Sequence, residues 1–148
     1  MVRKASVTSS AASAIAQLAL KVAKDKGSQV AVAVDEAGIP LVILRTDYGT
    51  EHVVTGATDK AWTALNFKNS TRAMLEHIKA DQGDDGQLPH AQRAIFLIGG
   101  VLLKDGDAVV GAVGVAVFPS GEQDDGAARM AAHEFQTMLA NEETHSPH

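Results

Sequence analysis

The sequence contains no cysteine, and aromatic residues make up only 4% of its 148 positions. The lack of cysteine excludes a disulfide scaffold, a thiolate metal site, a cysteine nucleophile and covalent c-type haem attachment. Because large rings are scarce, alanine and valine must fill most of the core, and we expect backbones to approach one another closely. The net charge of -5 offers no basic surface for DNA or RNA, whose binding depends on neutralising phosphates.

Long apolar runs are also missing, and none approaches the roughly 18–20 residues that a membrane span requires. The N-terminal segment carries Arg3 and Lys4 but continues with Gln17, Lys21 and Lys24. This composition indicates an amphipathic helix and not the uncharged core of a signal peptide. We therefore expect a cytoplasmic protein without a membrane partner. The apolar content of 45% and the charged content of 21% are typical of a globular domain.

The spacing of apolar residues predicts helices and strands in the order α-β-β-α-α-β-β-β-α. Hairpins dominate over βαβ units, so the predicted fold is α/β of the α+β kind, with an antiparallel sheet of about five strands flanked by helices. One domain is expected to cover the chain, with a core of residues 8–140 and a frayed tail over 141–148. The predicted helices span 8–26, 53–67, a segment that follows Asn69 or Ser70, and 122–140. The predicted strands span 29–35, 40–44, 94–98, 101–103 and 108–118. The polar stretch 81–89 is predicted to be a loop.

Motifs that would identify a common enzyme class are absent. The glycines at 99–100 and at 111 and 114 do not form GxGxxG before a helix, and no GxxxxGK[ST] is present. We interpret these glycines as residues of tight turns and close strand packing. His133 lacks the second histidine of a zinc-protease HExxH motif, and no serine lies in a GxSxG elbow.

Six short motifs nevertheless occur in a fixed order. They are D-x-x-G at 35–38, R-x-D at 45–47, K-A-x-T-A at 60–64, G-G at 99–100, G-x-x-G-V at 111–115 and E-Q-D at 122–124. Each motif alone is weakly specific, but the ordered set covers about residues 10–135 and resembles the GlcG/HbpS family of haem-binding or haem-degrading domains. The resemblance implies a profilin-like fold and a homo-oligomer between a dimer and an octamer. The apolar segments 101–103 and 116–118 depart from the family pattern, which predicts an altered pocket.

Four polar residues are candidates for binding a ligand. Lys60 and Thr63 lie three positions apart on a predicted helix, so both can face one site, where a cation and a hydroxyl suit a carboxylate or propionate. The alternative is a salt-bridged lysine and a threonine that packs between helices. Arg45 and Asp47 share one face of a strand, where they either pair with each other or leave Arg45 to clamp an anion.

A second group of candidates includes acid–base and metal-binding residues. His52 precedes the Lys60 helix, where its imidazole is either a haem-iron ligand, an acid–base catalyst or a surface side chain. Asp124 begins the last helix and is either a helix cap or, in an enzyme, a general base. Gln123 and the glycines Gly99 and Gly100, which belong to the family pattern, complete the expected ligand-binding residues.

Two functions from different classes therefore remain open. The first is a small-ligand binding protein, whose ligand is haem or another carboxylated small molecule, with His52 as the possible iron ligand. The second is a cofactor-independent isomerase, lyase or cyclase in which Lys60, Arg45 and Thr63 bind the acid and His52 or Asp124 moves a proton. Haem is the only cofactor that the resemblance implies.

Overall fold

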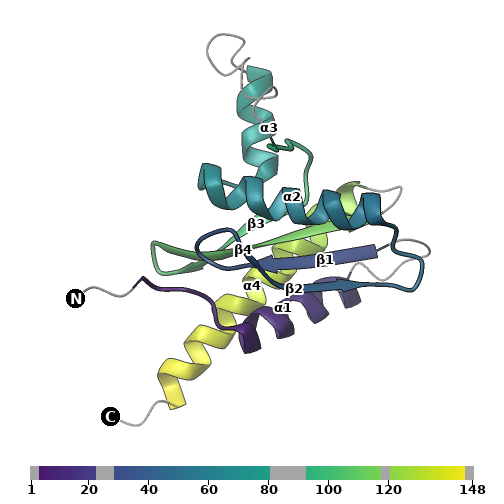
Figure 1. Ribbon diagram of the computed structural model, residues 1–148. Helices are drawn as coiled ribbons and strands as arrows, with labels where there is room; N and C mark the ends of the chain where they lie inside the picture. Colours follow the sequence, from purple (N-terminus) through teal and green to yellow (C-terminus); the bar gives the residue numbers. More distant parts are fainter. Residues whose placement is uncertain (1–3, 23–28, 81–92, 118–120, 146–148) are drawn as a thin grey trace.

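The computed structural model describes residues 4–22, 29–80, 93–117 and 121–145. Its elements are α1 (Ser9–Val22), β1 (Gln29–Val34), β2 (Pro40–Arg45), α2 (Glu51–Phe67), α3 (Thr71–Ala80), β3 (Gly100–Asp105), β4 (Ala108–Val117) and α4 (Gly121–His145). The strands form one antiparallel sheet in the order β2-β1-β4-β3. Helices α1 and α4 cover one face of this sheet and α2 covers the other (Figure 1).

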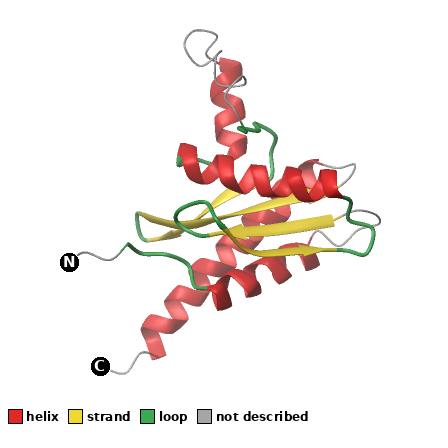
Figure 2. Ribbon diagram, in the orientation of Figure 1, coloured by secondary structure: helices red, strands yellow, loops and turns green. Residues whose placement is uncertain are grey.

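The two faces of the sheet have separate cores because side chains alternate along each strand. On β1, Ala31 and Ala33 face α1 and α4, where they join a cluster that includes Ile15 and Phe135. The valines at 30, 32 and 34 face α2. Helix α3 extends away from the α2 layer (Figure 2). The mixed architecture, an antiparallel sheet flanked by helices, is the one that the sequence predicted.

Small residues allow α2 to lie directly on the sheet, as the scarcity of large side chains predicted. A Cβ atom at Gly114 would collide with the Ala57 carbonyl and lie 2.7 Å from the Ala61 nitrogen, and one at Gly100 would collide with the Lys60 carbonyl. Both glycines therefore serve close packing, because any side chain there would push the helix off the strands.

The prediction of five strands was wrong, because the structure has four among the described residues. The segment 94–98 is not a strand and contacts helix α2 instead. The Ile95 N–H donates to Thr63 Oγ1 at 3.0 Å, and the Phe96 ring packs edge-on against Phe67 with 5.4 Å between centroids. A short apolar run is compatible with a strand, so the sequence pattern does not exclude one. The contacts with α2 decide the conformation of this segment.

Several predicted boundaries also differ. Helix α2 begins at Glu51, so His52 lies in its first turn and not in the preceding loop. Helix α4 continues to His145 beyond the predicted end at 140, because no glycine or proline interrupts the sequence after Gly126 until Pro147. Predicted features at 23–26 and 81–89 lie outside the described residues.

The first hairpin explains the D-x-x-G motif as a turn. Asp35 Oδ1 accepts hydrogen bonds from the N–H groups of Ala37 at 2.9 Å and Ile39 at 3.0 Å. Gly38 has φ of 84°, a left-handed conformation that favours glycine. Both motif residues therefore shape the connection between β1 and β2.

Among the described helices, none is both long enough and apolar enough to cross a bilayer.

Candidate functional site

A cavity of about 220 Å³ opens at the end of the sheet where β4 finishes and α4 begins. Helix α2 and the segment 95–97 supply its other walls. Its polar lining residues are His52, Lys60 and Asp124, and its apolar walls are Val53, Gly56, Ile95, Leu97, Ala116 and Val117. All three polar residues are among the site residues that the sequence predicts. Their roles in binding or catalysis stay predictions.

Lys60 and Asp124 form a buried ion pair at this cavity. Lys60 Nζ lies 2.8 Å from Asp124 Oδ2, and only 7% and 4% of the two side chains are exposed. The same ammonium donates to the Val115 carbonyl at 3.1 Å. The contact joins α2, β4 and α4, whose residues lie far apart in the sequence. Lys60 is therefore a salt-bridged lysine, which is one of the two alternatives that the sequence left open.

Asp124 has an unusual electrostatic environment for a carboxylate. Burial raises the pKa of its carboxyl above the ordinary value of 3.8, although the hydrogen bond and positive charge of Lys60 and a backbone hydrogen bond from Val117 act in the opposite direction. Its Oδ1 atom is buried and has no hydrogen-bond partner among the described residues. Asp124 lines the cavity, and a raised pKa of a carboxyl in a cavity is a property of many binding and proton-transfer sites.

Gly99 makes room for this ion pair. A Cβ atom there would lie 3.0 Å from Asp124 Cβ and 3.1 Å from Lys60 Cδ, and the residue has φ of 126°. Its carbonyl accepts a hydrogen bond from the Val115 N–H at 2.9 Å. Gly100 donates its N–H to Thr71 Oγ1 at 2.9 Å. The glycine pair therefore packs against the residues of the ion pair, and neither glycine lines the cavity.

Thr63 does not face the cavity together with Lys60. It is fully buried, and its hydroxyl accepts the Ile95 N–H, so it holds the segment that forms one cavity wall. His52 is exposed in the first turn of α2, at the cavity lining. An imidazole in this position is accessible to a ligand or an iron atom.

The remaining predicted residues lie nearby but outside the lining. The sheet register pairs Val30 with both Arg45 and Ala116, so Arg45 lies two strands from the cavity wall, a distance of roughly 10 Å. Its guanidinium donates to the carbonyl oxygens of Thr46 at 3.1 Å and Asp47 at 3.4 Å. Gln123 is exposed in the first turn of α4. The structure therefore does not gather Arg45, Lys60 and Thr63 around one carboxylate.

Four wall residues were not predicted from the sequence to belong to the site. Ile95 and Leu97 were expected in a strand, and Val53 and Gly56 in a helix. An isolated glycine inside a helix is a usable signal, because it costs helix stability unless packing or function requires it. A Cβ atom at Gly56 would meet only Ala116 Cβ, at 4.0 Å. Close packing therefore does not require this glycine.

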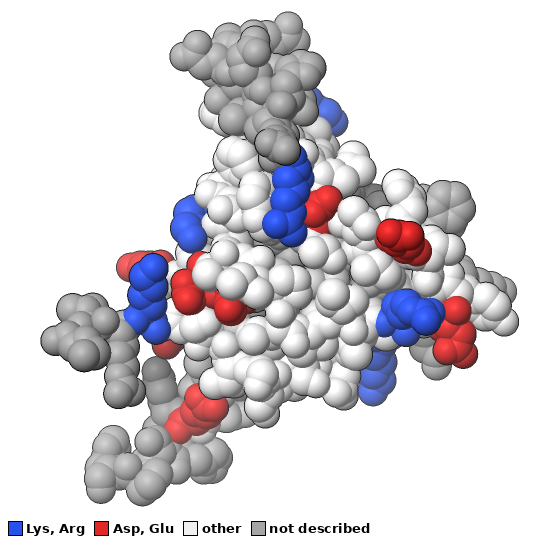
Figure 3. Space-filling view, in the orientation of Figure 1, with Lys and Arg blue, Asp and Glu red and all other residues white. Residues whose placement is uncertain are grey.

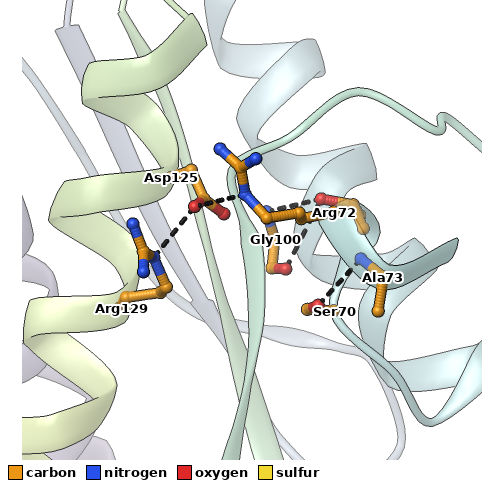
Figure 4. Close-up of polar contacts among 7 residues, drawn as sticks. Ser70, Arg72, Ala73, Gly100, Asp125 and Arg129 are labelled. Atoms are coloured by element: carbon orange, nitrogen blue, oxygen red, sulfur yellow. Dashed lines mark hydrogen bonds and ion pairs between the residues drawn. The ribbon is translucent and has the colours of Figure 1, made fainter. Parts of the chain in front are cut away.

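A second buried carboxylate ties the last helix to α3. Asp125 is fully buried, and its Oδ2 atom accepts from Arg72 Nε and Arg129 Nε, each at 2.9 Å (Figure 4). The sequence does not predict this cluster, because Arg72 and Asp125 are 53 positions apart. Asp124 and Asp125 thus point to different partners from the same turn, one at the cavity and one at the helix contact.

Among the described residues, no group of three metal-ligating side chains is present.

Comparison with known proteins places this arrangement in a family. The family model described as haem degrading protein HbpS-like matches residues 7–133. The chain belongs to the HbpS-like family. This result confirms the resemblance inferred from the ordered motifs. None of the curated proteins compared matches the chain significantly.

Solved structures agree with this assignment. A double mutant of HbpS from Streptomyces reticuli has 29% identity and a TM-score of 0.81, and the match covers 90% of each chain. The ORFY protein of Klebsiella pneumoniae has 29% identity and a TM-score of 0.80, with 92% of this chain and 94% of ORFY covered. PduOC in a complex with haem has 21% identity and a TM-score of 0.74, with 86% of this chain and 94% of PduOC covered. The last comparison shows a common fold.

Proposed function

We propose that this member of the HbpS-like family is a small-ligand binding protein whose ligand, haem or a related carboxylated tetrapyrrole, is held at the His52 cavity. The observation that carries the proposal is an exposed imidazole beside an apolar wall, at the open end of the sheet. Membership in the HbpS-like family and the haem complex of PduOC support the choice of ligand. His52 would bind the iron, and Val53, Ile95 and Leu97 would contact the ring.

The cavity residues fit one part of a haem. An imidazole is a common iron ligand, and the aliphatic side chains suit the apolar macrocycle. The volume of about 220 Å³ is below the roughly 300–1,000 Å³ of pockets that enclose drug-sized ligands. The ring would therefore rest with much of its surface outside the cavity. Bound haem would supply its iron chemistry, while the described residues bind and orient it.

A haemin titration of the purified protein tests this proposal. We expect a saturable Soret shift with a fixed stoichiometry in the unaltered chain. His52→Ala should abolish the shift or change the spectrum of the bound iron, because the imidazole is lost. His133→Ala is the matched control, since His133 is also an exposed histidine on a helix but does not line the cavity. Unsaturable adsorption, or equal spectra for both variants, would contradict haem ligation by His52.

Acid–base catalysis is the second candidate function. Burial raises the pKa of Asp124, and its Oδ1 atom has no partner among the described residues, which favours a role in proton transfer. Such an enzyme would be an isomerase, lyase or cyclase that needs no cofactor. Turnover of a small carboxylated metabolite that is lost in Asp124→Asn, without a haem spectrum, would support this alternative. Retention of full turnover in that variant would exclude Asp124 as the base.

Self-association is a further part of the proposed function. Ile39, just before β2, and Leu41 and Ile43 within it are 61%, 37% and 47% exposed. The face that carries β2 has a broad area without charged side chains, and charges of both signs lie around it (Figure 3). An open strand edge with exposed apolar side chains favours pairing with another strand. These features support a homo-oligomer, while the cytoplasmic location stays a prediction.

A further inference from the structure

Helix α2 carries a glycine in the cavity wall, at a position where neither packing nor backbone conformation requires one. Gly56 lies inside α2, where glycine costs helix stability relative to alanine. A Cβ atom there would meet only Ala116 Cβ, at the ordinary van der Waals distance of 4.0 Å. At Gly114, by contrast, a Cβ atom would collide with the backbone of α2. What Gly56 supplies is therefore open space at the cavity lining.

This open space lies beside His52. His52 and Gly56 are four positions apart on α2, so they are neighbours on one face of the helix, and both line the cavity. Side chains on a helix lean toward its N-terminus. A side chain at position 56 would therefore lean toward the imidazole of His52 and fill the space on its cavity side. Glycine leaves that side of the imidazole open.

The residues around this space form an apolar wall. Val53 of α2 and Ala116 and Val117 of β4 line the cavity, and each is no more than 8% exposed. An apolar ring over Gly56 would contact this wall, and the burial of apolar surface would stabilise the complex. A planar ring whose iron is bound by His52 extends sideways from the iron. Part of such a ring can lie in the open space, because glycine lets a ligand approach the α2 backbone closely.

We propose that Gly56 is a specificity-determining residue of the cavity: its missing side chain admits one edge of a planar macrocycle beside His52, and a larger side chain there excludes the ring. The inference rests on the proposed function, because it takes His52 as the iron ligand and the same cavity as the binding site. The fit of the ring then depends on the α2 backbone at Gly56 as well as on the imidazole. A small reagent that reaches the imidazole from solvent does not need this space.

Gly126 provides a matched control for Gly56. Each glycine lies inside a helix and is partly exposed, and a Cβ atom at Gly126 would meet nothing within 4 Å. Gly126 belongs to α4 and does not line the cavity. Leucine favours a helix more than glycine does, so Gly56→Leu and Gly126→Leu should both keep or raise the Tm. A calorimetric Tm no lower than that of the unaltered chain shows that a loss of binding does not come from unfolding.

Haemin titrations followed by the Soret band measure the effect on the ring. Gly56→Leu should raise the Kd for haemin about tenfold or more, because one extra methylene in an apolar pocket is worth roughly 10–200-fold. Gly56→Ala adds only one methyl group and should raise the Kd by a smaller factor. Gly126→Leu should bind haemin as tightly as the unaltered chain does.

Carbethoxylation of His52 by diethyl pyrocarbonate distinguishes exclusion of the ring from loss of the iron ligand. Because His52 is exposed, this small reagent should modify it at similar rates in Gly56→Leu and in the unaltered chain. Mass spectrometry of the peptide that contains His52 gives both rates. A lower haemin affinity at unchanged His52 reactivity would show that the side chain at position 56 blocks the ring and not the imidazole.

Weaker haemin binding in the Gly56 variants but not in Gly126→Leu, with His52 still reactive, supports the proposal. Haemin binding by both Gly56 variants that is as tight as that of the unaltered chain overturns it. An equal loss of affinity in Gly126→Leu, or a loss of His52 reactivity in Gly56→Leu, overturns it as well. The proposed function survives these results if haemin gives a saturable Soret shift that depends on His52. If the unaltered chain shows no such shift, both proposals fail.

Discussion

Lys60 shows how one side chain can be identified from sequence while its environment cannot. Its helical spacing placed it on the same side as Thr63, but the backbone N–H of Ile95 takes the Thr63 hydroxyl. Lys60 instead pairs with Asp124, 64 positions later in the chain. Such a pairing depends on how α2 and α4 pack, which local spacing does not specify. His52, Lys60 and Asp124 were nevertheless recognisable as candidates from their motifs and positions.

The buried ion pair gives a prediction about stability. Lys60→Met and Asp124→Asn should each destabilise the protein by about 3–5 kcal/mol, because each leaves an uncompensated buried charge. The double variant should lose less than the sum of the single variants, since it leaves no charge unpaired. Urea unfolding of the four proteins measures these energies.

An exposed ion pair provides the control for this comparison. Arg93 and Asp59 lie 3.0 Å apart, but 42% and 23% of their side chains are exposed. Asp59→Asn should therefore cost no more than about 1 kcal/mol. Single variants of Lys60 and Asp124 that are as stable as Asp59→Asn would show that the buried pair does not hold α2 against α4.

Glycines determine how closely the helical layer and the sheet approach. Gly114 lies beneath α2, whose backbone would collide with any Cβ atom at that position. Gly126 lies within α4, and a Cβ atom there would meet nothing within 4 Å. The sequence alone does not distinguish these two glycines, but in the structure only Gly114 lies between a helix and a strand.

Substitution of these two glycines should have opposite effects. Gly114→Ala should destabilise the protein by roughly 1–3 kcal/mol or more, because α2 must move away from β4. Gly126→Ala should stabilise it by about 0.5–1 kcal/mol, because alanine favours the helix. Calorimetry should show a lower Tm for the first variant and a higher Tm for the second. A Gly114→Ala protein as stable as the unaltered chain would contradict the close helix–sheet contact.

At the scale of the whole molecule, the helices cover the two faces of strand β2 unequally. Val42 and Leu44 of β2 pack against the α1 and α4 layer, but Ile43 on the opposite face is 47% exposed. Ile43 pairs with Val32, so it lies on the α2 side, where α2 covers Val32 and leaves β2 open. Edge strands without charged residues readily accept another strand. The self-association proposed above would cover this part of the sheet.

Disruption of this edge should change the assembly. Ile43→Lys places a charge on the exposed face of β2, so the particle mass should fall toward the 15.4 kDa of one chain. Met130→Lys is the control, because Met130 is also 55% exposed but lies on α4. Size-exclusion chromatography with light scattering measures both masses. A monomeric unaltered protein would contradict self-association, and an unchanged mass for Ile43→Lys would exclude the β2 edge as the interface.

Most helices and hairpins, the antiparallel sheet and the family can be predicted from the sequence, because local periodicity, turn residues and ordered motifs carry that information. The segment 94–98 forms a cavity wall and not a strand because of its contacts with Thr63 and Phe67, which local patterns do not reveal. The same is true of the pairing of Lys60 with Asp124. The physical reason is that long-range packing sets burial and charge partners, whereas spacing along the chain sets only the face on which a side chain lies.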